Sequence, residues 1–231
     1  METGFGKQTS FTTPRLADSP GLDINSQRGA RRAEYLLVIY PNGELQEKLL
    51  EAQQQFSADY GLQMTVRNKP HITVAAFQAG EIMEETLIRW VQRICTSYKS
   101  FELTLNNYSG FPPHTIYLRV QDPHPFRQLM QQLRSIDEFI RSSGCPPANL
   151  VSRPFLSIAG GLTEQVYNKA MPDYSRRTFH ESFQVDELVL LKRTHSFDAC
   201  KTVNIFRLQP GSVGIPSDAT DPSTAFPSQH L

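Results

Sequence analysis

One short pattern occurs twice in this chain and constrains its fold more than any other feature. The first copy, Lys69–Ala75, reads KPHITVA, and the second, Arg153–Ala159, reads RPFLSIA. The copies lie 84 positions apart and align without a gap. Six of the seven positions match in kind: a base, a proline, two branched aliphatic residues, a small hydroxyl residue and an alanine. The repeat predicts a duplicated unit in which two equivalent strands occupy equivalent places.

The one mismatch falls at the third position, where the first copy has His71 and the second has Phe155. In an extended strand, residues two apart face the same side. His71 and Thr73 therefore share a face, and Ile72 faces the opposite side, toward a core. If a two-fold axis relates the two strands, both faces line one cleft, with Ser157 as the counterpart of Thr73.

The rest of the chain alternates between strand-like and helix-like patterns. Short apolar or alternating runs predict strands, and apolar residues spaced three and four apart predict amphipathic helices. Gly61 and Thr163 are placed to cap helices. The predicted strands are 35–40, 71–77, 101–105, 115–120, 155–159, 183–193 and 202–208, and the predicted helices are 44–60, 81–98, 125–141 and 164–170. Residues 106–114 are expected to form a turn-rich connection, and the last two strands a hairpin.

This order predicts an α+β fold made by duplication. We expect two lobes, about 34–121 and 122–209, with antiparallel sheets around a central cleft and helices outside. The segments 1–33 and 210–231 are poor in apolar residues and show no periodicity, so they are predicted to be disordered tails.

Composition narrows the class of partner. The formal net charge of the 231-residue chain is zero, which gives no global basic field for a large nucleic-acid footprint. Three scattered cysteines favour reduced thiols and a cytoplasmic location over a disulfide framework or a zinc site. No apolar run reaches the length of about 20 residues that a membrane span needs. A monomer that does not contact a membrane is expected.

Paired imidazoles and hydroxyls across one cleft suit phosphodiester chemistry. One imidazole removes a proton from the attacking oxygen, the other protonates the leaving oxygen, and the hydroxyls bind the non-bridging phosphate oxygens. An unperturbed histidine pKa of about 6.5 fits this work near neutral pH. Such a mechanism requires no metal and no cofactor.

The paired His-x-Thr/Ser motifs, their spacing and the strand–helix order resemble the 2H phosphoesterase superfamily, which includes 2′-5′ RNA ligase-like proteins and cyclic phosphodiesterases. The resemblance covers roughly 35–209. By this resemblance the first motif, His71-Ile72-Thr73, matches fully. The second, Phe155-Leu156-Ser157, keeps the hydroxyl and loses the histidine. The implied catalytic residues are His71, Thr73 and Ser157.

The loss of one positioned acid or base typically costs about 10²–10⁴ in rate. Phe155 instead offers a ring on which a base can stack. Lys69 and Arg153 either lend positive potential to a phosphate or are simply bases at strand starts. His114, beside Tyr117, is a candidate for the missing proton donor, and the alternative is a solvent-facing loop histidine. We predict that these five residues bind substrate.

Two functions follow. In the first, the protein acts on an RNA end or a small nucleotide by metal-free acid–base chemistry, impaired by the missing histidine. In the alternative, the chain is a catalytically inactive module of the same fold that binds a nucleotide or RNA. If neither ligand binds, a structural or protein-interaction role remains.

Overall fold

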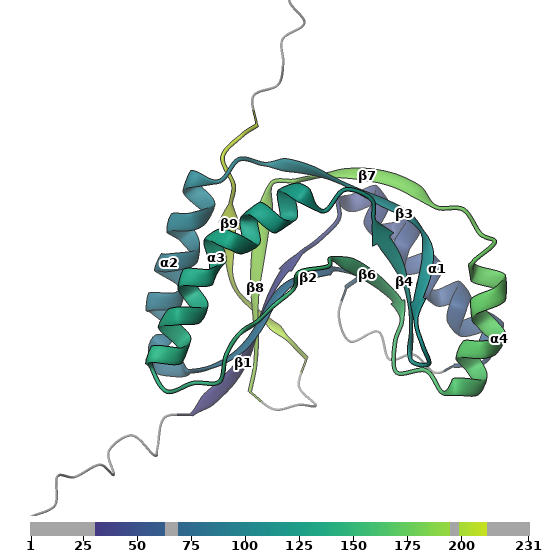
Figure 1. Ribbon diagram of the computed structural model, residues 1–231, viewed down its shortest axis with the longest axis horizontal. Helices are drawn as coiled ribbons and strands as arrows, with labels where there is room; N and C mark the ends of the chain where they lie inside the picture. The colour runs from purple at the N-terminus through teal and green to yellow at the C-terminus, as the bar shows by residue number, and fades with distance from the viewer. Residues whose placement is uncertain (1–30, 63–68, 195–198, 212–231) are drawn as a thin grey trace, which may run out of the picture. The chain divides into compact units, whose positions relative to one another are not determined.

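The computed structural model describes residues 31–62, 69–194 and 199–211. Most of the predicted tails, residues 1–30 and 212–231, lie outside the described residues. The described part contains nine strands in one antiparallel, strongly curled sheet and four α-helices (Figure 1). The α+β fold class is therefore confirmed.

The elements follow the predicted order closely. The strands are β1 (Arg32–Ile39), β2 (Ile72–Gly80), β3 (Phe101–Phe111), β4 (Thr115–Val120), β5 (Asn149–Leu150), β6 (Phe155–Ala159), β7 (His180–Val185), β8 (Glu187–Arg193) and β9 (Lys201–Arg207). The helices are α1 (Gly43–Tyr60), α2 (Glu84–Ser97), preceded by the 3₁₀ turn η2 (Glu81–Met83), α3 (His124–Ser142) and α4 (Glu164–Tyr174).

Both predicted caps are present. Gly61 ends α1 in the left-handed conformation with φ 61°, and its N–H donates to the Ser57 carbonyl. The Thr163 side chain accepts from the Val166 N–H at the start of α4. These local signals depend on neighbouring residues only, which is why the sequence reveals them.

The strand order is β7-β3-β4-β6-β2-β1-β8-β9, and β5 pairs with β2. We call β7, β3, β4 and β6 the first side of the sheet, and β2, β1, β8 and β9 the second side. Helices α1 and α4 pack on the first side, and α2 packs on β9 of the second side, with α3 against α2 (Figure 1). The helices thus lie outside the curled sheet.

The two sides do not correspond to the predicted lobes at 34–121 and 122–209. Each side combines strands from both halves of the sequence, since β1 and β2 lie beside β8 and β9 while β3 and β4 lie beside β6 and β7. Strand pairing over long sequence distances decides this arrangement, and a linear order of elements does not reveal it.

Two strand predictions are wrong in detail. Residues 106–111 belong to β3 and not to a connection, because β3 continues to pair with β4 past a bulge at Asn107, which has φ 51°. Gly110 sits in this stretch since a Cβ there would overlap the Tyr167 hydroxyl of α4. The turn itself is limited to Pro112–His114.

The predicted strand 183–193 is divided at Asp186. Strand β7 before it pairs with β3 at one edge of the sheet, whereas β8 after it pairs with β1 and β9. The Asp186 carbonyl accepts from the Leu208 N–H at this division. The predicted hairpin is therefore formed by β8 and β9 alone.

Candidate active site

The two copies of the repeated pattern have the same burial at every position. In each copy the base is exposed, the proline is buried, the third and fifth residues are half-buried, and the remaining three are buried. Ile72 and Leu156, equivalent positions in the two copies, are both fully inaccessible and face each other as the paired residues of β2 and β6. The duplication in the sequence is thus a duplication in structure.

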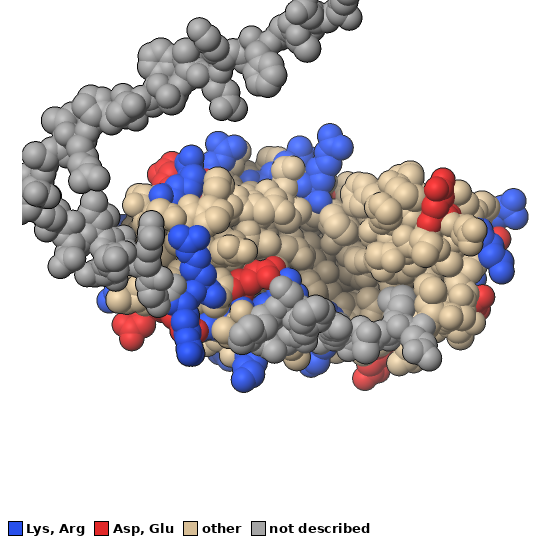
Figure 2. Space-filling view, turned by 90° about the horizontal axis from the view of Figure 1, so that it is seen from below, with Lys and Arg blue, Asp and Glu red and all other residues tan. Residues whose placement is uncertain are grey.

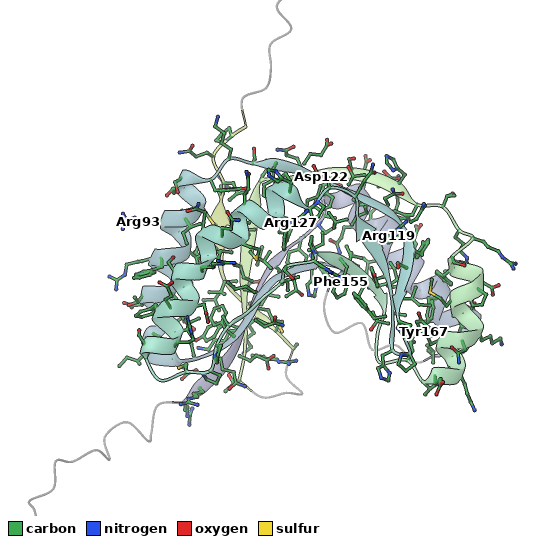
Figure 3. The ribbon with its side chains drawn as sticks, viewed as in Figure 1. Arg93, Arg119, Asp122, Arg127, Phe155 and Tyr167 are labelled. Atoms are coloured by element: carbon green, nitrogen blue, oxygen red, sulfur yellow. The ribbon has the colours of Figure 1, made fainter. Side chains whose placement is uncertain are left out.

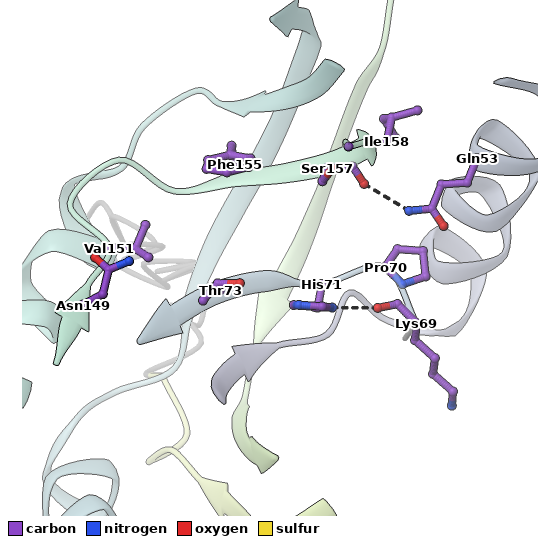
Figure 4. A pocket seen from close by; sticks show the side chains of 11 residues that line it. Gln53, Lys69, Pro70, His71, Thr73, Asn149, Val151, Phe155, Ser157 and Ile158 are labelled. Carbon is purple, nitrogen blue, oxygen red and sulfur yellow. Dashed lines mark hydrogen bonds between the residues drawn. The ribbon is translucent and has the colours of Figure 1, made fainter. Parts of the chain in front are cut away.

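The half-buried residues of both copies line one pocket. Its volume is about 360 Å³, and it lies where β2 and β6 meet, beside α1 (Figure 4). The face seen in Figure 2 is hollowed near its middle, between the two sides of the sheet. The lining residues are Gln53, Lys69, Pro70, His71, Thr73, Asn149, Val151, Phe155, Ser157, Ile158 and Gly160.

The His71 ring is oriented by a backbone carbonyl. Its Nδ1 lies 2.8 Å from the Lys69 carbonyl oxygen, and because a carbonyl can only accept, Nδ1 carries the proton. In the neutral ring Nε2 is then the basic nitrogen, on the side of the ring turned away from Lys69 (Figure 4). Burial lowers the pKa of His71 below its usual value, although the Lys69 carbonyl opposes this shift. His71 is thus suited to accept a proton at neutral pH.

Two hydroxyls and the amides of Gln53 and Asn149 are further polar groups of the pocket. Thr73 on β2 and Ser157 on β6 supply the hydroxyls. Gln53 of α1 donates through Nε2 to the Ser157 carbonyl at 3.0 Å (Figure 4). Gln53 was not predicted from the sequence, since its partner is 104 positions away and leaves no local pattern.

Phe155 belongs to a group of three aromatic rings. Its ring centroid lies 5.1 Å from those of Phe111 and Tyr117, and the latter two are stacked at 4.3 Å. Phe111 is 45% exposed, so the group reaches from the pocket to solvent. Phe155 and Tyr117 were predicted from the sequence, whereas Phe111 was not, because it lies in the stretch predicted to be a turn.

Of the other predicted binding residues, one lines the pocket and two lie outside it. Lys69 lines the pocket, but its side chain extends away from Thr73 (Figure 4). Arg153 is exposed and is not among the lining residues. His114 is also outside them: its Nδ1 lies 3.3 Å from the Leu162 carbonyl oxygen in the turn after β3. Of the described residues that line the pocket, His71 is the one whose side chain can exchange protons near neutral pH.

A further cation lies close to Phe155. Arg119 on β4 is the paired residue of Phe155 on β6, and paired residues of neighbouring strands point to the same face (Figure 3). Arg119 is exposed. It therefore stands on the same sheet face as the pocket and was missed because the alternation of β4 alone does not show its partner.

The described part of the chain lacks both a metal-binding cluster and a membrane-spanning helix. No three His, Cys, Asp or Glu residues there are grouped so that they could hold a metal ion. None of its helices combines the length and apolar character required to cross a membrane.

Solved structures confirm the fold. Escherichia coli LigT complexed with 3′-AMP superposes with a TM-score of 0.59 at 19% identity, covering 77% of this chain and 98% of LigT. A crystallised phosphoesterase gives 0.55 at 18% identity over the same shares of the two chains. The Thermus thermophilus protein TT0787 gives 0.51 at 14% identity, again over 77% and 98%.

No curated protein matches the sequence. A family model does, and it extends over residues 43–196, two-thirds of the chain and both motifs. It describes the 2′-5′ RNA ligase superfamily, and together with the LigT-like fold it confirms the resemblance to 2H phosphoesterases. The chain belongs to the 2′-5′ RNA ligase superfamily.

Proposed function

We propose that the pocket binds the phosphodiester of an RNA end or a small nucleotide, and that His71 alone supplies acid–base chemistry, so that turnover is slow. The observation that carries the proposal is that one pocket is lined by His71 and Thr73 from one motif and by Ser157 from the other. The hydroxyls donate to non-bridging phosphate oxygens, and no metal is needed for this step.

The pocket offers an acid–base group on only one side of the phosphorus. Neutral His71 accepts the proton of the attacking oxygen through Nε2, because Nδ1 is held by the Lys69 carbonyl. In an in-line displacement the leaving oxygen departs from the opposite side of the phosphorus, where the second motif has Phe155. A phenyl ring cannot protonate this oxygen. Leaving-group departure is therefore the step that we expect to limit turnover.

A nucleotide is the ligand that the pocket suits best. The aromatic group of Phe155, Tyr117 and Phe111 adjoins the hydroxyls, and a base stacked on an aromatic side chain contributes about 1–3 kcal/mol. Arg119 adds positive charge on the same face. LigT was crystallised with 3′-AMP, ATP and NADP+, which supports a nucleotide as the first ligand to test.

The same aromatic group favours a second candidate function, a binding module without catalysis. If departure of the unprotonated leaving group is too slow to matter, the pocket still holds phosphate and base. In either form we propose a monomer in the cytoplasm. The three cysteines, which are all unpaired, support this location.

The test measures binding and turnover separately. Calorimetry with a 2′,3′-cyclic nucleotide reports binding, and product analysis in the presence of EDTA reports hydrolysis of that nucleotide and of a 2′-5′-linked dinucleotide. Slow turnover that His71→Ala abolishes supports the enzyme, whereas binding with no turnover supports the module. Turnover unchanged in His71→Ala contradicts the role of His71, and the absence of both binding and turnover contradicts the proposal.

A further inference from the structure

Two glutamines of α1 hold the two motifs by their backbones. Gln46 donates through Nε2 to the Pro70 carbonyl at 3.2 Å, and Gln53 donates to the Ser157 carbonyl at 3.0 Å. They are seven positions apart, which is about two helical turns, and so they share one face of the helix. A single rigid helix thus contacts one carbonyl in each copy of the repeat.

The strands that carry the motifs have little direct contact with each other. In the described structure, β2 and β6 are paired at one position, Ile72 with Leu156. By contrast, β1 pairs with β2 at eight positions and β3 with β7 at six. Strand β5, which leads into β6, adds two pairs with β2, and the Val151 N–H donates to the Val74 carbonyl. Direct bonds between β2 and β6 are nevertheless few, so a support beside the sheet contributes to the relative placement of the two half-sites.

Helix α1 contacts β7 on the first side of the sheet and α4, which packs on that side. The Lys48 ammonium lies 2.6 Å from the Glu181 carboxylate of β7, and the Tyr60 hydroxyl donates to Asp173 of α4 at 3.0 Å. The Phe56 ring also packs on Tyr174 of α4, with centroids 5.1 Å apart. From this base Gln53 holds β6, and Gln46 reaches across to the residue just before His71.

The carbonyl that Gln46 holds is next to the one that orients the catalytic ring. The Lys69 carbonyl accepts from His71 Nδ1, and the Pro70 carbonyl, one residue later, accepts from Gln46. Gln53, for its part, leaves its Oε1 buried without a hydrogen-bond partner in the described structure. A buried unpaired acceptor destabilises a fold. Stability alone therefore does not explain a glutamine at position 53.

We propose that Gln46 and Gln53 are positioning residues, which together fix the separation of the His71–Thr73 half-site from the Phe155–Ser157 half-site. Both hydroxyls can then contact one phosphate. The consequence for phosphate binding rests on the proposed function, but the support that α1 gives to the two strands does not need a ligand. The two parts are therefore tested separately.

The first test uses the ligand-free full chain. Amide hydrogen exchange is measured at Ile72 and Leu156 in Gln46→Met, Gln53→Met and the double variant, with Gln55→Met as the matched control. Gln55 is exposed on the same helix and bonds to Asp59 within it. We expect exchange at the β2–β6 contact to become about 3- to 10-fold faster in each single variant, the effect of losing one hydrogen bond, and to be unchanged in the control.

The pattern of the double variant distinguishes a shared support from two separate contacts. Side chains about 10 Å apart normally have additive effects. A support with two ends fails when either end is lost, so the double variant should exchange no faster than the faster single variant. Gln46→Lys retains an N–H donor and should restore slow exchange. Additive effects, or wild-type exchange in both single variants, would overturn the proposal.

The second test measures the affinity for inorganic phosphate by calorimetry. Each single variant should bind about 3- to 10-fold more weakly than the wild type. If the wild type binds phosphate and the variants bind it with the same affinity, the proposed effect on the site is wrong. A wild type that binds no phosphate would contradict the proposed function, and the exchange measurement would still decide whether α1 supports the two strands.

Discussion

Strands β2 and β6 carry the same seven-residue pattern and bury it in the same way, yet they differ in the chemistry of one side chain. Ile72 and Val74 are as inaccessible as Leu156 and Ile158. The half-buried position before them holds an imidazole in one strand and a phenyl ring in the other. Fold requirements therefore act on the buried positions, and the position that faces the pocket can change without disturbing them.

The surroundings of the two third positions have also diverged. His71 is held by the Lys69 carbonyl, and its ring lies edge-on to Tyr40 with centroids 6.0 Å apart. Phe155 packs instead with Phe111 and Tyr117. The first environment orients a proton acceptor, whereas the second encloses an apolar ring. The second half-site is therefore an aromatic surface as a whole, and it differs from the first in more than one group.

The largest expected effect comes from making the second motif like the first. Phe155→His should raise the rate of 2′,3′-cyclic nucleotide hydrolysis by about 10²–10⁴, since it supplies an acid for the leaving oxygen. Product formation in EDTA measures the gain, with Phe155→Leu as the control that changes the ring without adding a titratable group. A rate that stays at the wild-type level would indicate that the aromatic surroundings no longer admit a catalytic imidazole.

The next prediction tests whether β2 and β6 contribute equally to the free energy of unfolding through their buried side chains. Ile72→Ala and Leu156→Ala each remove a fully buried aliphatic side chain, and each should lower the free energy of unfolding by about 2–5 kcal/mol. Urea denaturation followed by circular dichroism measures both. Ile82→Ala, at a position 88% exposed, should cost no more than about 0.5 kcal/mol. A loss below about 1 kcal/mol in one strand alone would show that the burial symmetry is not an energetic symmetry.

The features that could be predicted from the sequence are those that depend on residues close together in the chain. The alternation in the repeat, the caps at Gly61 and Thr163 and the shared face of His71 and Thr73 depend on residues close in sequence. The interleaving of the two sequence halves in the sheet depends on pairings between distant strands. Gln46 and Gln53 reach carbonyls 24 and 104 positions away, and nothing near them in sequence marks those partners. The site was therefore predictable where it lies on the repeat and not where α1 and β3 contribute.

A smaller effect compares the two hydroxyls. Thr73→Val and Ser157→Ala should each weaken the binding of inorganic phosphate about 10- to 100-fold, because a hydrogen bond to a charged group contributes about 1.5–3 kcal/mol. Calorimetry measures this, and Thr202→Val on the exposed face of β9 provides the control. If only one of the two changes affects binding, the phosphate is held by a single motif and the pocket does not use the duplication.

The smallest effect is the pH dependence that His71 gives to the free energy of unfolding, which a phenylalanine at the third position of the motif cannot give. Burial lowers the pKa of His71 in the folded chain relative to the unfolded chain, in which it is about 6.5. Between these two values the unfolded state binds more protons, so the free energy of unfolding should fall as the pH drops below about 6.5, and this contribution should level off once the pH is below the folded pKa. Urea titrations from pH 8 to pH 5 measure the slope. His71→Phe gives the first motif the residue of the second and should remove this part of the slope, since a phenyl ring does not titrate. An identical slope in the variant would mean that His71 is solvated in solution. His71 would then not be enclosed in the way that Phe155 is.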